Sequence, residues 1–170
     1  LLNRQVETFN RLLHISREVQ LDQPLPQALE KIAIAIQETT PFQVVLVSLY
    51  DPISGMLERT CHAGIPEDVW EQLRSHIQPY ASVRKLLKSK YLISRSYYIP
   101  HDQEPVVPED IHSVVVLPLR GAQGANTWDP DDLLLTPLQT SDGTPLGLIS
   151  VDAPRDGLQP DRTTIESLEI

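Results

Sequence analysis

The chain has 170 residues, 41% of them hydrophobic, which suits one domain with a core of its own, alone or with flanking helices, and leaves little room for two. Its formal net charge of −9 argues against a nucleic-acid partner, because such binding rests largely on Lys and Arg side chains that neutralise phosphates. No apolar run reaches the roughly 20 residues of a membrane span, and a single cysteine forms neither an internal disulfide nor a cysteine-based zinc site.

The ends of the chain indicate a segment of a longer protein. It starts on Leu-Leu-Asn-Arg without a signal-peptide pattern, and its last residues, TTIESLEI, are typical of a helix that is cut short. The single cysteine and the lack of a long apolar run are compatible with a cytoplasmic domain without direct membrane contact, which is what we expect.

Residues 1–20 are predicted to form an amphipathic helix, because apolar residues recur at alternating helical spacings. They form two neighbouring stripes: Leu2, Val6, Phe9 and Leu13 in one, and Leu12, Ile15 and Val19 in the other. One stripe can pack on the domain while the other faces a second copy, so we expect a signalling and dimerisation helix. A helix packed only on its own core is the alternative.

A second helix is predicted to end at Pro41, with Leu25, Leu29, Ile32 and Ile36 at helical spacing before it. The period then changes to that of strands. Residues 42–51 and 56–64 flank the turn sequence DPISG and are predicted to form a hairpin.

Further elements follow in chain order. Short helices are predicted from Pro66 to Ile77 and over residues 82–89, and residues 90–100 are a third strand candidate. Residues 101–130 form a long connection around the apolar run HSVVVLPLR, which suits either a strand of the sheet or an inserted flap.

Residues 131–154 give the clearest hairpin, with two apolar strands around Ser141-Asp142-Gly143, because Asp-Gly tolerates positive φ. A last helix begins near Asp161, with Ile165 and Leu168 pointing inward. This order of elements favours an α+β fold with an antiparallel sheet and helices on one face.

Over residues 22–170 the sequence resembles a GAF domain, a sensor module of bacterial signalling proteins. The resemblance rests on four stretches: Thr39-Thr40-Pro41-Phe42, Ala63-Gly64-Ile65-Pro66, ISRSYYIP, and above all WDPDDLLLTPLQTSDGTPLGLISVDAP with its DGLQP tail. We accordingly take residues 1–20 as the signalling helix and residues 21–170 as the GAF domain.

The resemblance implies a central antiparallel sheet of about six strands. Terminal helices would pack on one face, and loops and short helices would roof a ligand pocket on the other. The roof would be residues 66–90 together with 101–130, and the relay would be residues 1–20 and the helix near Asp161. It also implies a homodimer with a fused output domain, such as a histidine kinase of a two-component system or a cyclic-dinucleotide enzyme.

The strand SRSYYIP supplies most of the candidate pocket residues. Alternation along a strand would place Ser94, Ser96 and Tyr98 on one face and Arg95, Tyr97 and Ile99 on the other. One face could thus bring hydroxyls with Tyr98, or a cation with Tyr97, into an apolar pocket. Trp128, on a loop above the sheet, would plug the pocket or cover a ligand. Ordinary strand packing is the alternative.

Cys61-His62 resembles the dipeptide that carries bilin in phytochrome-type GAF domains, but there the cysteine follows the roof helices, whereas Cys61 precedes them. We therefore interpret Cys61 as a structural strand residue, with no cofactor attachment. A reactive thiol would need an electropositive setting, for which only Arg59, expected on the same face, and His62 are at hand.

Other chemistry finds little support in the sequence. There is no Asn-Lys pair of the cyclic-nucleotide-binding kind and no phosphate-cradling glycine loop. His101 and His112, in the predicted roof loop, are weak candidates for an iron ligand, and the Asp129-Pro130-Asp131-Asp132 cluster is interpreted as a turn. We predict no metal site, and the identity of any cofactor stays open.

The sequence thus predicts a non-enzymatic, small-molecule-sensing domain of a bacterial signalling protein. Two alternatives stay open: a ligand-free dimerisation spacer, whose apolar side chains would close the space under Trp128, and a thiol enzyme that uses Cys61.

Overall fold

The computed structural model describes residues 25–103 and 124–169. The predicted helix of residues 1–20, the apolar run of residues 112–120 and His112 lie outside the described residues.

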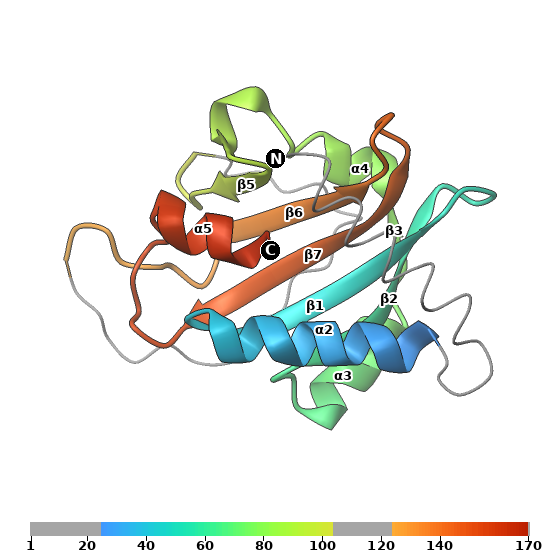
Figure 1. Cartoon of the computed structure of the whole chain (residues 1–170), viewed down its shortest axis with the longest axis horizontal. Coiled ribbons are helices and arrows are strands. Elements are labelled where there is room, and N and C mark those ends of the chain that lie inside the picture. Colours follow the sequence, from blue (N-terminus) through green and yellow to red (C-terminus); the bar gives the residue numbers. More distant parts are fainter. Residues whose placement is uncertain (1–24, 104–123, 170) are drawn as a thin grey trace.

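An antiparallel sheet of seven strands runs through the described part of the chain, in the order β3-β2-β1-β7-β6-β5-β4 (Figure 1). Its strands are β1 (Phe42–Asp51), β2 (Met56–Ala63), β3 (Gln78–Pro79), β4 (Leu92–Ile93), β5 (Ser96–Ile99), β6 (Leu133–Gln139) and β7 (Pro145–Pro154). The antiparallel sheet confirms the predicted fold class. The count exceeds the expected six because two strands of two residues each, β3 and β4, extend the edges.

Helices cover both faces of the sheet. Those of the described residues are α2 (Leu25–Thr39), α3 (Glu67–Arg74), α4 (Tyr80–Arg84), the 3-10 turn η1 (Ser89–Tyr91) and α5 (Arg162–Leu168). α2 and α5 pack on one face through Leu29, Ala33, Ile165 and Leu168. α3 and α4 pack on the other, so terminal and internal helices are separated by the sheet.

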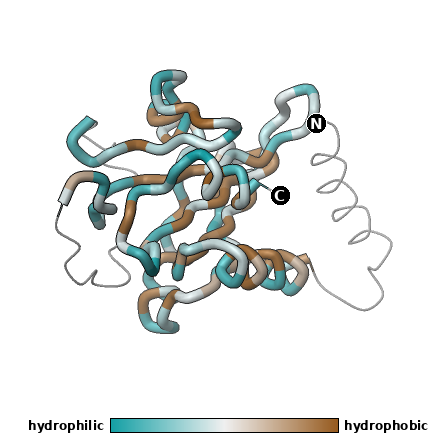
Figure 2. The backbone as a smooth tube through the Cα atoms, turned by 60° about the vertical axis from the view of Figure 1, so that its left-hand side comes forward, coloured by the Kyte–Doolittle hydropathy of each residue, from teal (hydrophilic) through white to brown (hydrophobic). Residues whose placement is uncertain are grey.

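The core divides along the same plane. Under α2 and α5 the sheet contributes Phe42, Val45, Val47, Cys61 and Ile149, all nearly inaccessible to solvent. A second cluster under α4 contains Leu57, Val83, Leu86, Leu135 and Leu148. Figure 2 shows hydrophobic segments gathered inside the molecule and hydrophilic segments at the loops. The period-2 pattern of the central strands therefore supplies apolar side chains to both faces, to one cluster under α2 and α5 and to two clusters under α4 and α3.

Residues 90–100 form a hairpin and not the single strand that was predicted. η1 leads into β4, Ser94 takes a left-handed conformation with φ of 61°, and β5 returns beside β4. The reversal has a cause 75 residues away, because the Glu169 carboxylate accepts hydrogen bonds from Ser94 Oγ at 2.6 Å and from the Arg95 amide at 2.8 Å. The predicted helix of residues 82–89 is likewise displaced, since α4 ends at Arg84.

The C-terminal part agrees with the prediction. β6 and β7 pair across the Asp-Gly turn, where Gly143 has a φ of 86°. The Asp161 side chain caps α5 by accepting a hydrogen bond from the Thr164 amide at 2.8 Å, and Ile165 of α5 is fully buried. This anchors α5 over the sheet.

Candidate ligand-binding cavity

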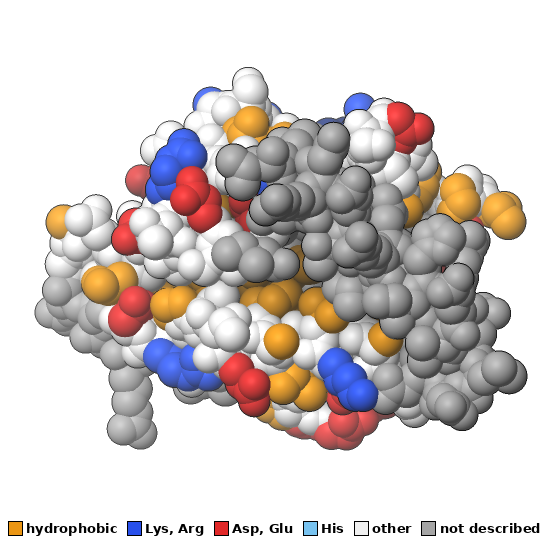
Figure 3. Space-filling model, viewed as in Figure 1, with side chains coloured by type: hydrophobic (Ala, Val, Ile, Leu, Met, Phe, Trp, Pro, Cys, Tyr) orange, Lys and Arg blue, Asp and Glu red, His pale blue; other side chains and the backbone are white. Residues whose placement is uncertain are grey.

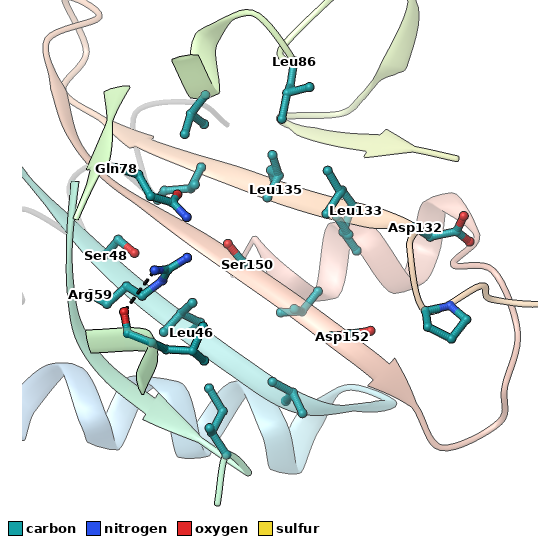
Figure 4. Close-up of a pocket in the computed structure, with 18 residues that line it drawn as sticks. Leu46, Ser48, Arg59, Gln78, Leu86, Asp132, Leu133, Leu135, Ser150 and Asp152 are labelled. Atoms are coloured by element: carbon teal, nitrogen blue, oxygen red, sulfur yellow. Dashed lines mark hydrogen bonds between the residues drawn. The ribbon is translucent and has the colours of Figure 1, made fainter. Parts of the chain in front are cut away.

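A cavity of about 110 Å³ lies between the sheet and the helices α3 and α4 (Figure 4). We call it the sheet cavity. Most of its wall is apolar and includes Leu46, Leu73, Leu86, Leu133, Leu135 and Leu148. Six polar residues complete it: Ser48, Arg59, Gln78, Asp132, Ser150 and Asp152. An apolar cavity with a few placed polar groups is the usual form of a small-molecule site.

The floor of the sheet cavity comes from alternate residues of the two central strands. β1 and β7 pair so that Ser48 lies opposite Leu148, Leu46 opposite Ser150, and Val44 opposite Asp152. The intervening side chains point into the core under α2. Serine and aspartate at alternate positions of an apolar strand thus put polar groups on one face of the sheet only.

A β-bulge brings Arg59 into this site. Val47 pairs with Cys61 and the next residue, Ser48, pairs with Arg59, so Thr60 is an extra residue in β2. An extra residue reverses the alternation of faces. Arg59 therefore lines the sheet cavity while Cys61 lies in the opposite core. The prediction that both share one face is wrong for this reason.

The Arg59 side chain is fixed in place at one end of the cavity. Its Nη1 donates to the backbone carbonyl of Leu73 at 3.0 Å and to that of His76 at 2.8 Å, both at the end of α3. Burial lowers the pKa of the guanidinium, which stays cationic because its ordinary pKa is so high. Gln78, also buried, lies beside it in the lining (Figure 4).

Two carboxylates lie at the other end. Asp132 has no exposed side-chain surface, and both its oxygens are occupied. Its Oδ1 accepts from the amide and Nδ1 of His101 at 2.9 and 3.0 Å, and its Oδ2 accepts from Tyr98 Oη at 2.8 Å and the Asp129 amide at 2.9 Å. Asp132 thus joins the end of β5 to the start of β6.

Asp152 is bonded through one oxygen. Its Oδ1 accepts hydrogen bonds from Trp128 Nε1 at 2.9 Å and from the Ala153 amide at 2.6 Å. Burial raises the pKa of this carboxyl, and the charges of Asp132 and Asp131 raise it further, against the lowering effect of the two hydrogen bonds.

None of the five candidates from the sequence is among the described residues that line the sheet cavity. Arg95 and Ser96 both contact Glu169 after α5, with Arg95 Nε at 3.5 Å and Ser96 Oγ at 2.7 Å from its carboxylate. The alternation that placed Arg95 with Tyr97 fails because Arg95 lies in the turn before β5. Ser96 is fully buried and also bonds Thr136 Oγ1 at 2.8 Å.

The aromatic candidates divide between the faces. Tyr97 packs in the cluster with Leu135 and Leu148, which line the cavity. Tyr98 and Trp128 pack on the α2 side, where their ring centroids are 5.9 Å apart. Trp128 reaches the cavity only indirectly, through its hydrogen bond to Asp152.

The side chains of Cys61 and His62 lie in different environments. Cys61 is 6% exposed in the core under α2, and burial, reinforced by the charge of Glu30, raises its thiol pKa to about 12. His62 packs against Trp70, with ring centroids 4.5 Å apart, and burial lowers its pKa. A neutral thiol in a core has the surroundings of a small hydrophobe, not of a nucleophile.

The Asp129–Asp132 stretch is a turn, as the sequence indicates, because Asp129 Oδ1 accepts from the Asp131 amide at 2.9 Å. Within residues 25–103 and 124–169 no group of three or more His, Cys, Asp or Glu side chains is arranged to hold a metal ion. In the same ranges, no helix has the length and apolar character needed to cross a bilayer.

Sequence reasoning missed the residues that line the cavity. Ser150 and Asp152, two residues apart in the apolar strand GLISVD, were a usable signal because polar residues at alternate positions of a strand share a face. The place of Arg59 in the cavity wall could not be predicted from the sequence, since the face of the sheet on which it lies depends on the bulge at Thr60.

No protein-family model matches the sequence, and no curated protein matches it significantly. Solved structures do match in fold. The GAF domain/HD domain protein from Geobacter sulfurreducens superposes with a TM-score of 0.59 at 9% identity, over 85% of this chain and 86% of that one. Residues 122 to 287 of a methyl-accepting chemotaxis protein superpose with a TM-score of 0.54 at 16% identity, over 91% and 88%.

The GAF domain from a phosphoenolpyruvate-protein phosphotransferase of Coxiella burnetii superposes with a TM-score of 0.53 at 15% identity, over 95% of this chain and 89% of that one. The chain has a GAF-like fold. At these sequence identities the similarity concerns the arrangement of helices and strands, and it does not indicate which ligand, if any, the cavity binds.

Proposed function

We propose that this chain is a regulatory domain of a bacterial signalling protein, which binds a small molecule in the sheet cavity and relays its presence through the terminal helices to a fused output domain. The observation that carries the proposal is the position of the cavity. It lies across the sheet from α2 and α5, and fixed polar groups interrupt its apolar wall. The fold neighbours from a chemotaxis protein and a phosphotransferase support a signalling context.

The β4–β5 hairpin offers a route from the cavity to α5. On one face of β5, Tyr97 packs with Leu135 and Leu148 of the cavity wall. On the other face, Ser96 bonds Glu169 directly after α5. If the hairpin has two positions, a ligand that binds more tightly to one of them shifts the equilibrium toward that position and so changes the position of α5. The size of this shift is set by the difference between the ligand's affinities for the two positions.

The proposal includes no catalytic step and no nucleic-acid partner. On the face shown in Figure 3, Lys and Arg side chains stand apart from one another among acidic ones, whereas nucleic-acid binding draws on clustered cations. Cytoplasmic location, homodimerisation and a histidine kinase as output belong to the same proposal.

A ligand-free spacer is the second candidate. The cavity of about 110 Å³ is smaller than the several hundred Å³ typical of sites for drug-sized ligands. A spacer would use the α2 and α5 face for assembly and leave the cavity without a role.

Native and denaturing mass spectrometry of the purified 170-residue chain separates the two. A noncovalent added mass, lost on denaturation, supports the sensor. Ser150→Leu places an apolar side chain into the cavity floor and should abolish the added mass. Gln72→Leu, at an exposed position of α3, should retain it. An apo mass, with no thermal stabilisation by a library of small metabolites, supports the spacer.

A further inference from the structure

Asp152 has hydrogen-bonding capacity to spare. A carboxylate offers about four acceptor positions over its two oxygens, and both bonds that Asp152 receives fall on Oδ1. Within the described residues Oδ2 accepts no hydrogen bond, and Asp152 forms no salt bridge. In the described part of the chain, therefore, no protein donor occupies this half-buried oxygen in the wall of a largely apolar cavity.

Asp132, at the same end of the cavity, provides the contrast. It receives four hydrogen bonds, two on each oxygen, and the imidazole of His101 lies 3.0 Å from its Oδ1. The fold thus fully satisfies one of the two carboxylates that line the cavity. The hydrogen bonds of Asp132 hold the end of β5 to the start of β6, whereas Oδ2 of Asp152 can still accept a hydrogen bond from a ligand.

The charges around Asp152 indicate what that partner is. The neighbouring charges that act on it, Asp132 and Asp131, are both negative. A half-buried carboxylate beside like charges gains most from a positive group that also donates hydrogen bonds. A neutral donor would supply only the hydrogen bond. An anion would be repelled by the carboxylates at this end of the cavity, whereas the cation of Arg59 lies at the other end and donates to the carbonyls of Leu73 and His76.

We propose that the sheet cavity selects a small primary amine, whose ammonium group binds Asp152 while its apolar body packs on the leucine-lined wall. This inference rests on the proposed function, since it names the ligand class of the same cavity. The size follows from the cavity volume of about 110 Å³. A cavity of about 150 Å³ holds benzene, so the body should have about four or five heavy atoms.

Trp128 provides a reporter within the site. Its indole N–H donates to Asp152 Oδ1, so a cation that binds Asp152 changes the resonance of this N–H group in a ¹H–¹⁵N spectrum. The chain has two tryptophans, and Trp70→Phe identifies the second signal. The probes are n-butylamine, 1-butanol and butyrate, which are close in size and differ in the charge of the head group.

At neutral pH we expect n-butylamine, as its ammonium ion, to shift the Trp128 signal saturably and to bind about tenfold more tightly than 1-butanol, with butyrate weaker still. Asp152→Asn keeps a carbonyl oxygen for Trp128 and removes the charge, so the preference for the amine should disappear. Asp68→Asn, on the exposed first turn of α3, should keep it.

Equal binding of n-butylamine and 1-butanol by the unmodified chain would overturn the amine assignment and leave a small-molecule site in place. A preference for the amine that survives in Asp152→Asn would also overturn it. If none of the probes shifts the Trp128 signal and the purified chain carries no added mass, both this inference and the proposed function fail. The comparison of probes on the unmodified chain holds even if Asp152→Asn folds poorly.

Discussion

At the scale of single residues, burial decides the chemistry of Cys61. The thiol lies in the core under α2, 6% exposed, and its pKa is raised to about 12. We expect no labelling by a disulfide reagent at pH 7.5 over minutes in the native protein and stoichiometric labelling after unfolding in guanidinium, because only the thiolate reacts. Rapid labelling of the native protein would instead favour the thiol enzyme.

Glu169, directly after α5, links this helix to the β4–β5 hairpin. Its side chain is 3% exposed and accepts hydrogen bonds from Ser94, Arg95 and Ser96. Glu169→Gln should lower the free energy of unfolding by about 1–3 kcal/mol, because the new amide group turns a donor toward donors.

Urea unfolding measures this difference. Glu166→Gln is the matched control, since Glu166 forms an ion pair with Arg162 on α5 while half exposed, and such pairs contribute about 0–1 kcal/mol. Equal effects of the two substitutions would show that Glu169 does not hold α5 in place.

At the scale of elements, the junction after β2 depends on a glycine. Gly64 has a φ of 77°, and a Cβ there would collide with the backbone carbonyl of Gln43 in β1. Gly64→Ala should therefore lower the free energy of unfolding by about 2–4 kcal/mol, from backbone strain and from the collision.

Gly55→Ala separates these two causes. Gly55 has a similar φ of 72° but no atom within 4 Å of the added Cβ, so it should cost only the strain of about 1–2 kcal/mol. Thermal or urea unfolding of both variants provides the measurement, and equal losses would mean that the contact with Gln43 relaxes freely.

At the scale of the whole molecule, the pH dependence of unfolding should report the link between β5 and β6. The hydrogen bond to Asp132, aided by the charges of Asp129, Asp132 and Asp102, raises the pKa of His101. A group whose pKa is higher in the folded state stabilises the fold fully below its ordinary pKa of about 6.5. This stabilisation is lost as the pH rises through the folded-state pKa.

The melting temperature of the unmodified protein should therefore exceed that of His101→Gln by more at pH 5.5 than at pH 8.5. His101 is about half exposed, so the difference is small and should shrink further in high salt. A gap that stays constant over this pH range would show that the imidazolium does not pair with Asp132 in solution.

The two faces of the sheet carry different elements. α2 and α5, the terminal helices of the described chain, share one core, and the sheet cavity with α3 and α4 lies on the other face. The central strands β1 and β7 belong to both. In the proposed sensor, a change in the cavity would reach α2 and α5 through these strands or through β5, where Tyr97 packs with the cavity wall and Ser96 bonds Glu169.

The sequence by itself determined the class of fold and the long elements. β1, β2, β6, β7 and α2 follow from local periodicity and turn residues, and so does the inward position of Ile165. Such patterns are local, because each residue's face depends only on its neighbours in the same strand or helix. The interpretation of Cys61 as a strand residue came instead from its position before the roof helices and from the hydrophobic character of a free thiol, and the structure places it in the core under α2.

Only the tertiary structure decided the site. Arg59 faces the cavity because of an extra residue in β2, which shows only against the register of β1. Ser94 and Arg95 form a turn because Glu169, distant in the sequence, accepts their hydrogen bonds. Asp132 accepts four hydrogen bonds and Asp152 only two, because other strands and loops bring more donors to Asp132. These contacts span the chain, and their residues carry no local pattern that would reveal them.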